Sequence, residues 1–144
     1  MDESTTRKLA DVLAHIDDTT AMEEFMVIPE VKDSYKNFTD YFRSLESVKE
    51  ISDTELISKS GIEKSYYYQI IKGTKNPGRD KILRLCIAAG LNMKETTRCL
   101  ELAGCAALYP KNRRDIIISV AINQKATVID TNLLLDTYSE PPLS

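Results

Sequence analysis

The chain has 144 residues, a length typical of one compact domain with a short appendage. Hydrophobic residues make up 42% of it and charged residues 28%, which favours a folded protein over a disordered one. The net charge is −3, the N-terminus is polar and acidic, and no apolar run reaches about 18 residues, so we expect a cytoplasmic protein with no membrane span or signal peptide.

Two short helices are expected at the start of the chain. The first is predicted by apolar residues that recur at intervals of three and four: Leu9, Val12, Leu13 and Ile16. Thr20 and Glu23 have the spacing of a capping box and predict a second helix that Pro29 ends. His15 lies off the apolar stripe of the first helix, so we expect it on the surface.

From about Tyr35, one broad apolar face predicts a single helix of about three to four turns, formed by Phe38, Tyr41, Phe42, Leu45 and Val48. Ser52 and Glu55 form another capping box, which predicts a helix over residues 53–60. That helix breaks at Gly61, because glycine readily adopts the left-handed turn conformation. The next helix begins near residue 63 or 64 and ends at Gly73, and residues 74–79 form a loop.

The second half of the chain is also expected to be helical. Asp80 is predicted to cap a helix that ends at residue 90, and Asn92 with Glu95 opens another that runs to residue 103. Residues 105–112 form a connector, and residues 113–123 and 128–138 form a helical hairpin, with Thr127 and Asp130 capping its second helix. Strand-like alternation over a full strand length is not found, so the sequence predicts an all-α fold.

The charges are distributed unevenly along the chain. Residues 1–58 hold 6 Lys and Arg against 14 Asp and Glu, residues 59–114 hold 12 against 4, and residues 115–144 hold 1 against 4. A basic centre between acidic flanks is typical of a polyanion-binding surface on an acidic protein.

Residues with catalytic or metal-binding chemistry are sparse. The cysteines are Cys86, Cys99 and Cys105, an odd number without a CxxC pair, so we expect reduced thiols and neither a metal site nor a cofactor. We find no nucleophile and base pair and no phosphate loop, and therefore expect no catalytic residues and no enzymatic activity.

The central segment contains a recognisable pattern. It runs from Glu55-Leu56-Ile57-Ser58-Lys59-Ser60-Gly61-Ile62 through Ser65-Tyr66-Tyr67-Tyr68-Gln69-Ile70-Ile71-Lys72-Gly73 to Asn76-Pro77 and Lys81-Ile82-Leu83. This pattern resembles the Cro and lambda-repressor type of helix-turn-helix transcriptional regulators, often called XRE. Residues 91–143, with Leu102-Ala103-Gly104, Leu108-Tyr109-Pro110 and Arg113-Arg114-Asp115, resemble the C-terminal helical extension of a longer bacterial subgroup.

The resemblance implies a lambda-repressor-like core with Leu56, Ile62, Tyr67 and Ile70 buried, and a recognition helix over about residues 64–72 in the major groove of double-stranded DNA. It places four residues where bases are read: Lys64, Ser65, Tyr68 and Gln69. Four more match backbone-contacting positions: Lys72, Lys75, Asn76 and Arg79. Asp53 and Glu63 depart from the family pattern, because they are anionic where the family has a phosphate-contacting glutamine and a hydroxyl cap.

These observations suggest three parts: acidic N-terminal helices at 1–34, a helix-turn-helix DNA-binding domain at 35–104, and a C-terminal hairpin at 105–144 that packs on the core or forms a dimer seam. We expect a DNA-binding transcriptional regulator that acts as a homodimer through the N-terminal helices or the hairpin. The alternative is a protein-interaction module of helix-turn-helix ancestry, such as an adaptor, an antitoxin-like protein or a kinase-associated partner. In that case the acidic N-terminal helices would bind a basic protein.

Overall fold

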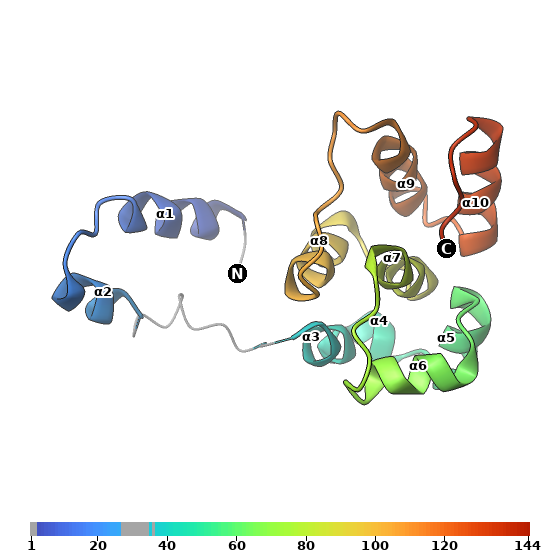
Figure 1. Ribbon diagram of the computed structural model, residues 1–144, viewed down its shortest axis with the longest axis horizontal. Helices are drawn as coiled ribbons and strands as arrows, with labels where there is room; N and C mark the ends of the chain where they lie inside the picture. The colour runs from blue at the N-terminus through green and yellow to red at the C-terminus, as the bar shows by residue number, and fades with distance from the viewer. Residues whose placement is uncertain (1–2, 27–34, 36) are drawn as a thin grey trace. The chain divides into compact units, whose positions relative to one another are not determined.

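The computed structural model describes residues 3–26, 35 and 37–144, and in these residues all regular secondary structure is helical. The expected all-α fold is thereby confirmed. The helices, in chain order, are α1 (Glu3–Leu13), α2 (Thr19–Met26), α3 (Phe38–Ser44), α4 (Glu46–Lys49), α5 (Asp53–Ser60), α6 (Lys64–Ile71), α7 (Arg79–Ala88), α8 (Met93–Leu102), α9 (Arg113–Asn123) and α10 (Val128–Thr137) (Figure 1).

The chain divides into two compact units, residues 1–35 and residues 36–144. The first unit contains α1 and α2, whose apolar side chains are only partly covered: Leu9, Ile16 and Phe25 are half-buried, while Val12 and Leu13 are exposed. His15 is exposed, as expected, and its ring nitrogen Nδ1 lies 2.8 Å from the carbonyl oxygen of Asp11. The second unit holds the hydrophobic core and all the residues of the predicted DNA-contacting surface.

The core of residues 36–144 is built around α7, which packs against α5, α8 and α10 (Figure 1). Its apolar side chains are buried, including Ile82, Leu83 and Leu85. Cys86 on α7 and Cys99 on α8 are buried as free thiols, and burial together with the neighbouring Cys99 raises the pKa of Cys86 well above its usual value. A position inside this core explains why α7 is apolar over most of its circumference.

The helix caps follow the sequence closely around α5, α8 and α10. The Ser52 hydroxyl accepts a hydrogen bond from the backbone N–H of Glu55 at 3.1 Å, and Thr127 accepts one from Asp130 at 3.0 Å. Asn92 and Glu95 form a complete reciprocal capping box. At α5 the box is only half formed, because the Glu55 carboxylate lies 3.6 Å from Lys59.

The single helix expected over residues 35–48 is wrong. Asn37 caps α3, and the chain leaves the helical conformation at Leu45, whose ψ is 138°, before α4 begins. In an unbroken helix, Val48 would lie about 120° around the axis from Phe42, since successive residues rotate by about 100°. The break turns the chain so that Phe42 and Val48 are both buried in the same core.

Two predicted N-caps are also wrong. The capping residue of α2 is Asp18, which accepts a hydrogen bond from the N–H of Ala21 at 2.7 Å, and not Thr20. The N-cap of α7 is Gly78, so Asp80 lies inside the first turn of the helix. The Asp80 carboxylate is available there for a partner from α9, described below. Pro29, the predicted end of the second helix, lies outside the described residues.

The helices α9 and α10 form the predicted hairpin. The spacing of apolar residues predicts core positions at Ile116, Ile117, Val120 and Ala121 on the first helix and at Val128, Ile129, Leu133, Leu134 and Tyr138 on the second, and only some of these are buried. Ile117 and Ala121 are buried as predicted, together with Ile118 and Ile122, whereas Ile116 and Val120 are exposed. On α10, Val128 and Leu135 are buried, while Ile129 and Leu133 are exposed. The hairpin therefore buries one apolar face in the core and leaves a second one uncovered.

Candidate nucleic-acid interface

The helix α6 presents its polar side chains on one face. At about 100° per residue, an arc of about 140° contains Lys64, Ser65, Tyr68, Gln69 and Lys72. All of these are exposed except Tyr68, which is half-buried. This α6 face brings the four predicted base-reading residues together with the first predicted backbone contact.

The opposite side of α6 fixes the orientation of this face. Tyr67 and Ile70 are buried, as are Leu56 on α5 and Ile62 in the turn between the helices, so all four residues expected in this part of the core lie there. The hydroxyl of Thr39 on α3 also donates a hydrogen bond to the carbonyl oxygen of Ile70 at 3.2 Å. Rotation of α6 about its axis would expose these apolar groups, so the α6 face is held outward.

The loop after α6 continues the same surface. Gly73 has φ of 79°, and the N–H groups of Thr74 and Lys75 both donate to the carbonyl oxygen of Gln69, at 3.0 and 3.3 Å. Such bonds close a helix and turn the chain sharply. Lys75 and Asn76 follow this closure and are exposed.

The turn between α5 and α6 depends on Gly61. Its φ is 68°, and a Cβ atom at this position would lie 2.8 Å from the guanidinium of Arg84. That guanidinium donates to the carbonyl oxygen of Ser60 at 2.9 Å and to that of Leu143 at 2.6 Å. Arg84 on α7 thus ties the end of α5 to the segment that follows α10.

Ser65 and Glu63 contact each other at the start of α6. Glu63 is the N-cap, but its carboxylate accepts a hydrogen bond from the Ser65 hydroxyl at 2.7 Å instead of capping the helix. The proton of Ser65 is therefore directed toward Glu63. A contact from this hydroxyl to a base would require Ser65 to give up that bond.

Asp53, the first residue of α5, is bound to the neighbouring helix. The buried Tyr67 donates its hydroxyl proton to the Asp53 carboxylate at 2.6 Å. Burial, and then the hydrogen bond to Asp53, raise the pKa of Tyr67 well above its usual value. The bond joins α5 to α6 and directs the carboxylate toward α6.

A hollow of about 400 Å³ lies at the N-terminus of α5, lined in part by Arg43, Lys49, Ser52, Asp53 and Tyr67. Arg43 and Lys49 are exposed, and Lys49 lies 4.0 Å from Glu46. Two cations and the positive end of a helix dipole attract anions. The sequence does not indicate Arg43 and Lys49 as contact residues, because the net charge of residues 1–58 is strongly negative and the helical spacing does not predict the break at Leu45.

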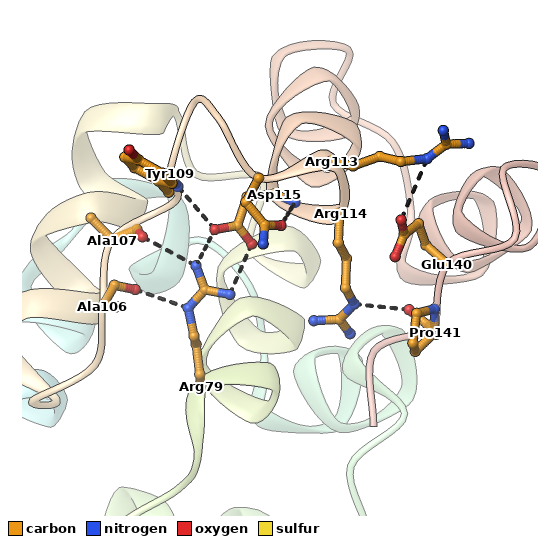
Figure 2. Close-up of a pocket in the computed structure, with 10 residues that line it drawn as sticks. Arg79, Ala106, Ala107, Tyr109, Arg113, Arg114, Asp115, Glu140 and Pro141 are labelled. Atoms are coloured by element: carbon orange, nitrogen blue, oxygen red, sulfur yellow. Dashed lines mark hydrogen bonds and ion pairs between the residues drawn. The ribbon is translucent and has the colours of Figure 1, made fainter.

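Arg79 is engaged inside the fold, unlike the other predicted contact residues. Its guanidinium donates two hydrogen bonds to the Asp115 carboxylate, at 3.0 and 2.8 Å, and one each to the carbonyl oxygens of Ala106 and Ala107 (Figure 2). Asp115 also accepts a bond from the N–H of Tyr109. Arg79 therefore holds the connector of residues 105–112 against α7. Its guanidinium donors are occupied by these acceptors and do not serve as a phosphate contact.

A second arginine–aspartate ion pair connects the same two helices as the pair of Arg79 and Asp115. Arg114 on α9 donates to Asp80 on α7 at 3.2 and 2.9 Å, so each Arg-Asp dipeptide supplies the arginine for the other's aspartate. We call these four residues the Arg-Asp clasp. Burial raises the pKa of Asp80 and of Asp115, but their hydrogen bonds outweigh it and hold both below the usual value. The clasp fixes α9 on α7.

Within the part of the chain that the structure describes, no helix has the length and apolar character needed to cross a membrane. In the same residues, no group of three or more His, Cys, Asp and Glu side chains is placed to hold a metal ion. Comparison of the chain with protein-family models, with curated proteins and with solved structures gives no match.

Proposed function

We propose that this protein is a sequence-specific DNA-binding regulator of transcription that inserts α6 into the major groove. The observation that carries the proposal is the α6 face, which is polar, basic and exposed while the other side of the helix is locked in the core. A recognition helix of a helix-turn-helix protein needs both properties.

The proposed base contacts are Lys64, Tyr68 and Gln69. An amide pairs bidentately with adenine, and a lysine donates to guanine O6 and N7, each such pair giving about 1 to 3 kcal/mol of discrimination. Ser65 has a smaller proposed role because Glu63 holds its hydroxyl. Arg79 is not among the proposed DNA contacts, because its guanidinium is hydrogen-bonded to Asp115 in the Arg-Asp clasp.

The proposed phosphate contacts flank the recognition helix. Lys72, Lys75 and Asn76 lie after α6, and Arg43 and Lys49 lie at the hollow before α5. The Asp53 carboxylate is one of the anionic groups in this region, and its bond to Tyr67 offsets part of its repulsion of phosphate. Contacts to the DNA backbone on both sides of the α5 and α6 pair would set the position of these helices on the duplex.

Alanine substitutions of Gln69 and of the two lysines should change DNA binding in different ways. Lys72→Ala or Lys75→Ala should weaken binding to every duplex and lower the slope of log K against log salt by about 0.9 for each lost phosphate contact. Gln69→Ala should relax preference at one base pair and leave non-specific affinity nearly unchanged. Fluorescence anisotropy on a selected site and a scrambled duplex measures both effects.

A matched control is Lys94→Ala, which removes an exposed lysine from α8, a helix that contributes no residue to the α6 face. It should change neither the affinity nor the salt slope. The proposal is rejected if the wild-type chain shows no salt-dependent duplex binding and the substitutions on α6 and its loop have no effect.

The second candidate function is a protein-interaction module, and the exposed apolar side chains of residues 7–26 favour it. Val12, Leu13 and Met26 are exposed beside acidic residues, which is typical of a helix surface that binds a partner with an apolar groove and a basic rim. A protein that binds no duplex, yet gains helix stability with a basic protein partner, would support this candidate.

A further inference from the structure

Two apolar faces are uncovered in the described residues, one on α1 and α2 and the other on the hairpin of α9 and α10. On the hairpin, four branched side chains are involved, with exposed fractions of 45% for Ile116, 43% for Val120, 73% for Ile129 and 60% for Leu133. We call these four residues the hairpin face. Apolar side chains that are grouped on the surface of a protein, and not scattered singly, mark an interaction surface.

The four side chains lie on the outward sides of their helices. Ile116 and Val120 each stand two residues from the fully buried Ile118, about 160° around the helix from it, and Ile129 and Leu133 stand two residues from the buried Thr131. Each helix of the hairpin therefore carries one apolar stripe on the side opposite its buried residue.

The two stripes also lie at the same height. Arg113 at the start of α9 donates a hydrogen bond to the carbonyl oxygen of Tyr138 just after α10, so the helices run antiparallel (Figure 1). Ile116 is therefore level with the second half of α10, where Leu133 lies, and Val120 is level with its first half, where Ile129 lies.

Charge decides which of the two uncovered faces suits a second copy of this chain. Residues 1–35 carry three Lys and Arg against nine Asp and Glu, so two copies meeting there would repel each other. Residues 113–138 carry three of each, and the hairpin face itself is uncharged. Two copies of the hairpin face can meet without net repulsion, as a self-complementary twofold interface requires.

We propose that the hairpin face is the homodimer interface, occupied by the hairpin face of a second copy of this chain. The inference deepens the proposed function, because it says where the two DNA-reading units are joined. The Arg-Asp clasp fixes α9 on α7, and Arg84 fixes α7 on the end of α5. A seam on α9 and α10 therefore sets the spacing between the two α6 helices.

Sedimentation equilibrium on the full chain, without DNA, tests the interface. The wild-type protein should be a dimer, Leu133→Lys should raise the dimer dissociation constant at least about 10-fold, and Leu133→Met should restore wild-type behaviour. Leu13→Lys is the matched control, because it makes the same change at a leucine of α1 that is 54% exposed, and it should leave the dimer intact. Circular dichroism melting should show that Leu133→Lys folds.

The proposal is overturned by a monomeric wild type, by a Leu133→Lys variant that still dimerises like wild type, or by dissociation in Leu13→Lys. Duplex binding, measured separately, distinguishes this failure from failure of the proposed function. A monomer with salt-dependent duplex binding contradicts only the interface, and a dimer without duplex binding contradicts only the DNA-binding role.

Discussion

Tyr67 and Asp53 form a link between α5 and α6 that is both structural and electrostatic. Replacement of Tyr67 by Phe keeps the buried ring but removes the hydroxyl that donates to Asp53 at 2.6 Å. A hydrogen bond to a charged group contributes about 1.5 to 3 kcal/mol, less where water competes, so Tyr67→Phe should lower the free energy of unfolding by about 1 kcal/mol. Urea denaturation measures the loss.

The same substitution should weaken duplex binding, because an unbonded Asp53 carboxylate repels phosphate more strongly. Asp53→Asn is the companion variant, and it should bind duplex DNA more tightly than wild type. Equal duplex affinity for wild type, Tyr67→Phe and Asp53→Asn would place Asp53 away from the DNA.

Gly61 and Gly90 allow a matched comparison of the turn between α5 and α6. Both have a positive φ, at 68° and 69°, but only Gly61 faces a neighbour, since a Cβ at Gly90 would meet nothing within 4 Å. Gly90→Ala should cost about 1 to 2 kcal/mol, the usual cost of a left-handed alanine. Gly61→Ala should cost more, because Arg84 must also move from its bond to Ser60. Equal losses of unfolding free energy would contradict the role of Arg84.

At the scale of the element, the position of α6 depends on its buried side. Ile70→Ala removes a buried side chain and should lower the free energy of unfolding by about 2 to 4 kcal/mol through the lost transfer energy and the cavity. Ile71→Ala, at a half-buried position one residue further, should cost less. A loss below about half a kilocalorie for Ile70→Ala would contradict the orientation of the α6 face.

The elements that the sequence predicts well are those with strong local signals. The bounds of α5 and α6 follow from the Ser52 cap, the positive φ of Gly61 and the glycine at 73, and α8 follows from its capping box. The break at Leu45 was not predicted, because the apolar spacing of residues 38–48 fits a continuous helix and only the tertiary core requires the turn.

The candidate site was predictable in part. The α6 face followed from the family resemblance and the helical period, but the engagement of Arg79 did not, because Asp115 is 36 residues away in the sequence. Likewise, the local sequence predicts Asp80 as a helix cap, whereas its carboxylate accepts hydrogen bonds from Arg114 on α9. Long-range ion pairs leave no periodic trace in one sequence.

At the scale of the molecule, the Arg-Asp clasp makes stability depend on pH. The pKa values of Asp80 and Asp115 are lowered in the folded state, so their contribution is fully present above about pH 4, the ordinary pKa of aspartate, and is lost as the pH falls below it. Asp115→Asn removes one ionised acceptor and should cost about 2 kcal/mol at neutral pH.

The difference between wild type and Asp115→Asn is the informative quantity, because other carboxylates titrate in both proteins. This difference in unfolding free energy should shrink as the pH is lowered below about 4. A difference that stays constant down to acid pH would show that the charge of Asp115 contributes nothing to stability. Urea denaturation at a series of pH values gives the comparison.

The most direct test of the central claim, that the α6 face reads DNA sequence, is selection of genomic fragments by the purified full chain at two salt concentrations. Higher salt suppresses non-specific phosphate binding, so specific sites should be enriched more strongly there. The account predicts a common sequence in the retained fragments, with two symmetric half-sites about 10 base pairs apart. Retained fragments that share no sequence at either salt concentration would contradict it.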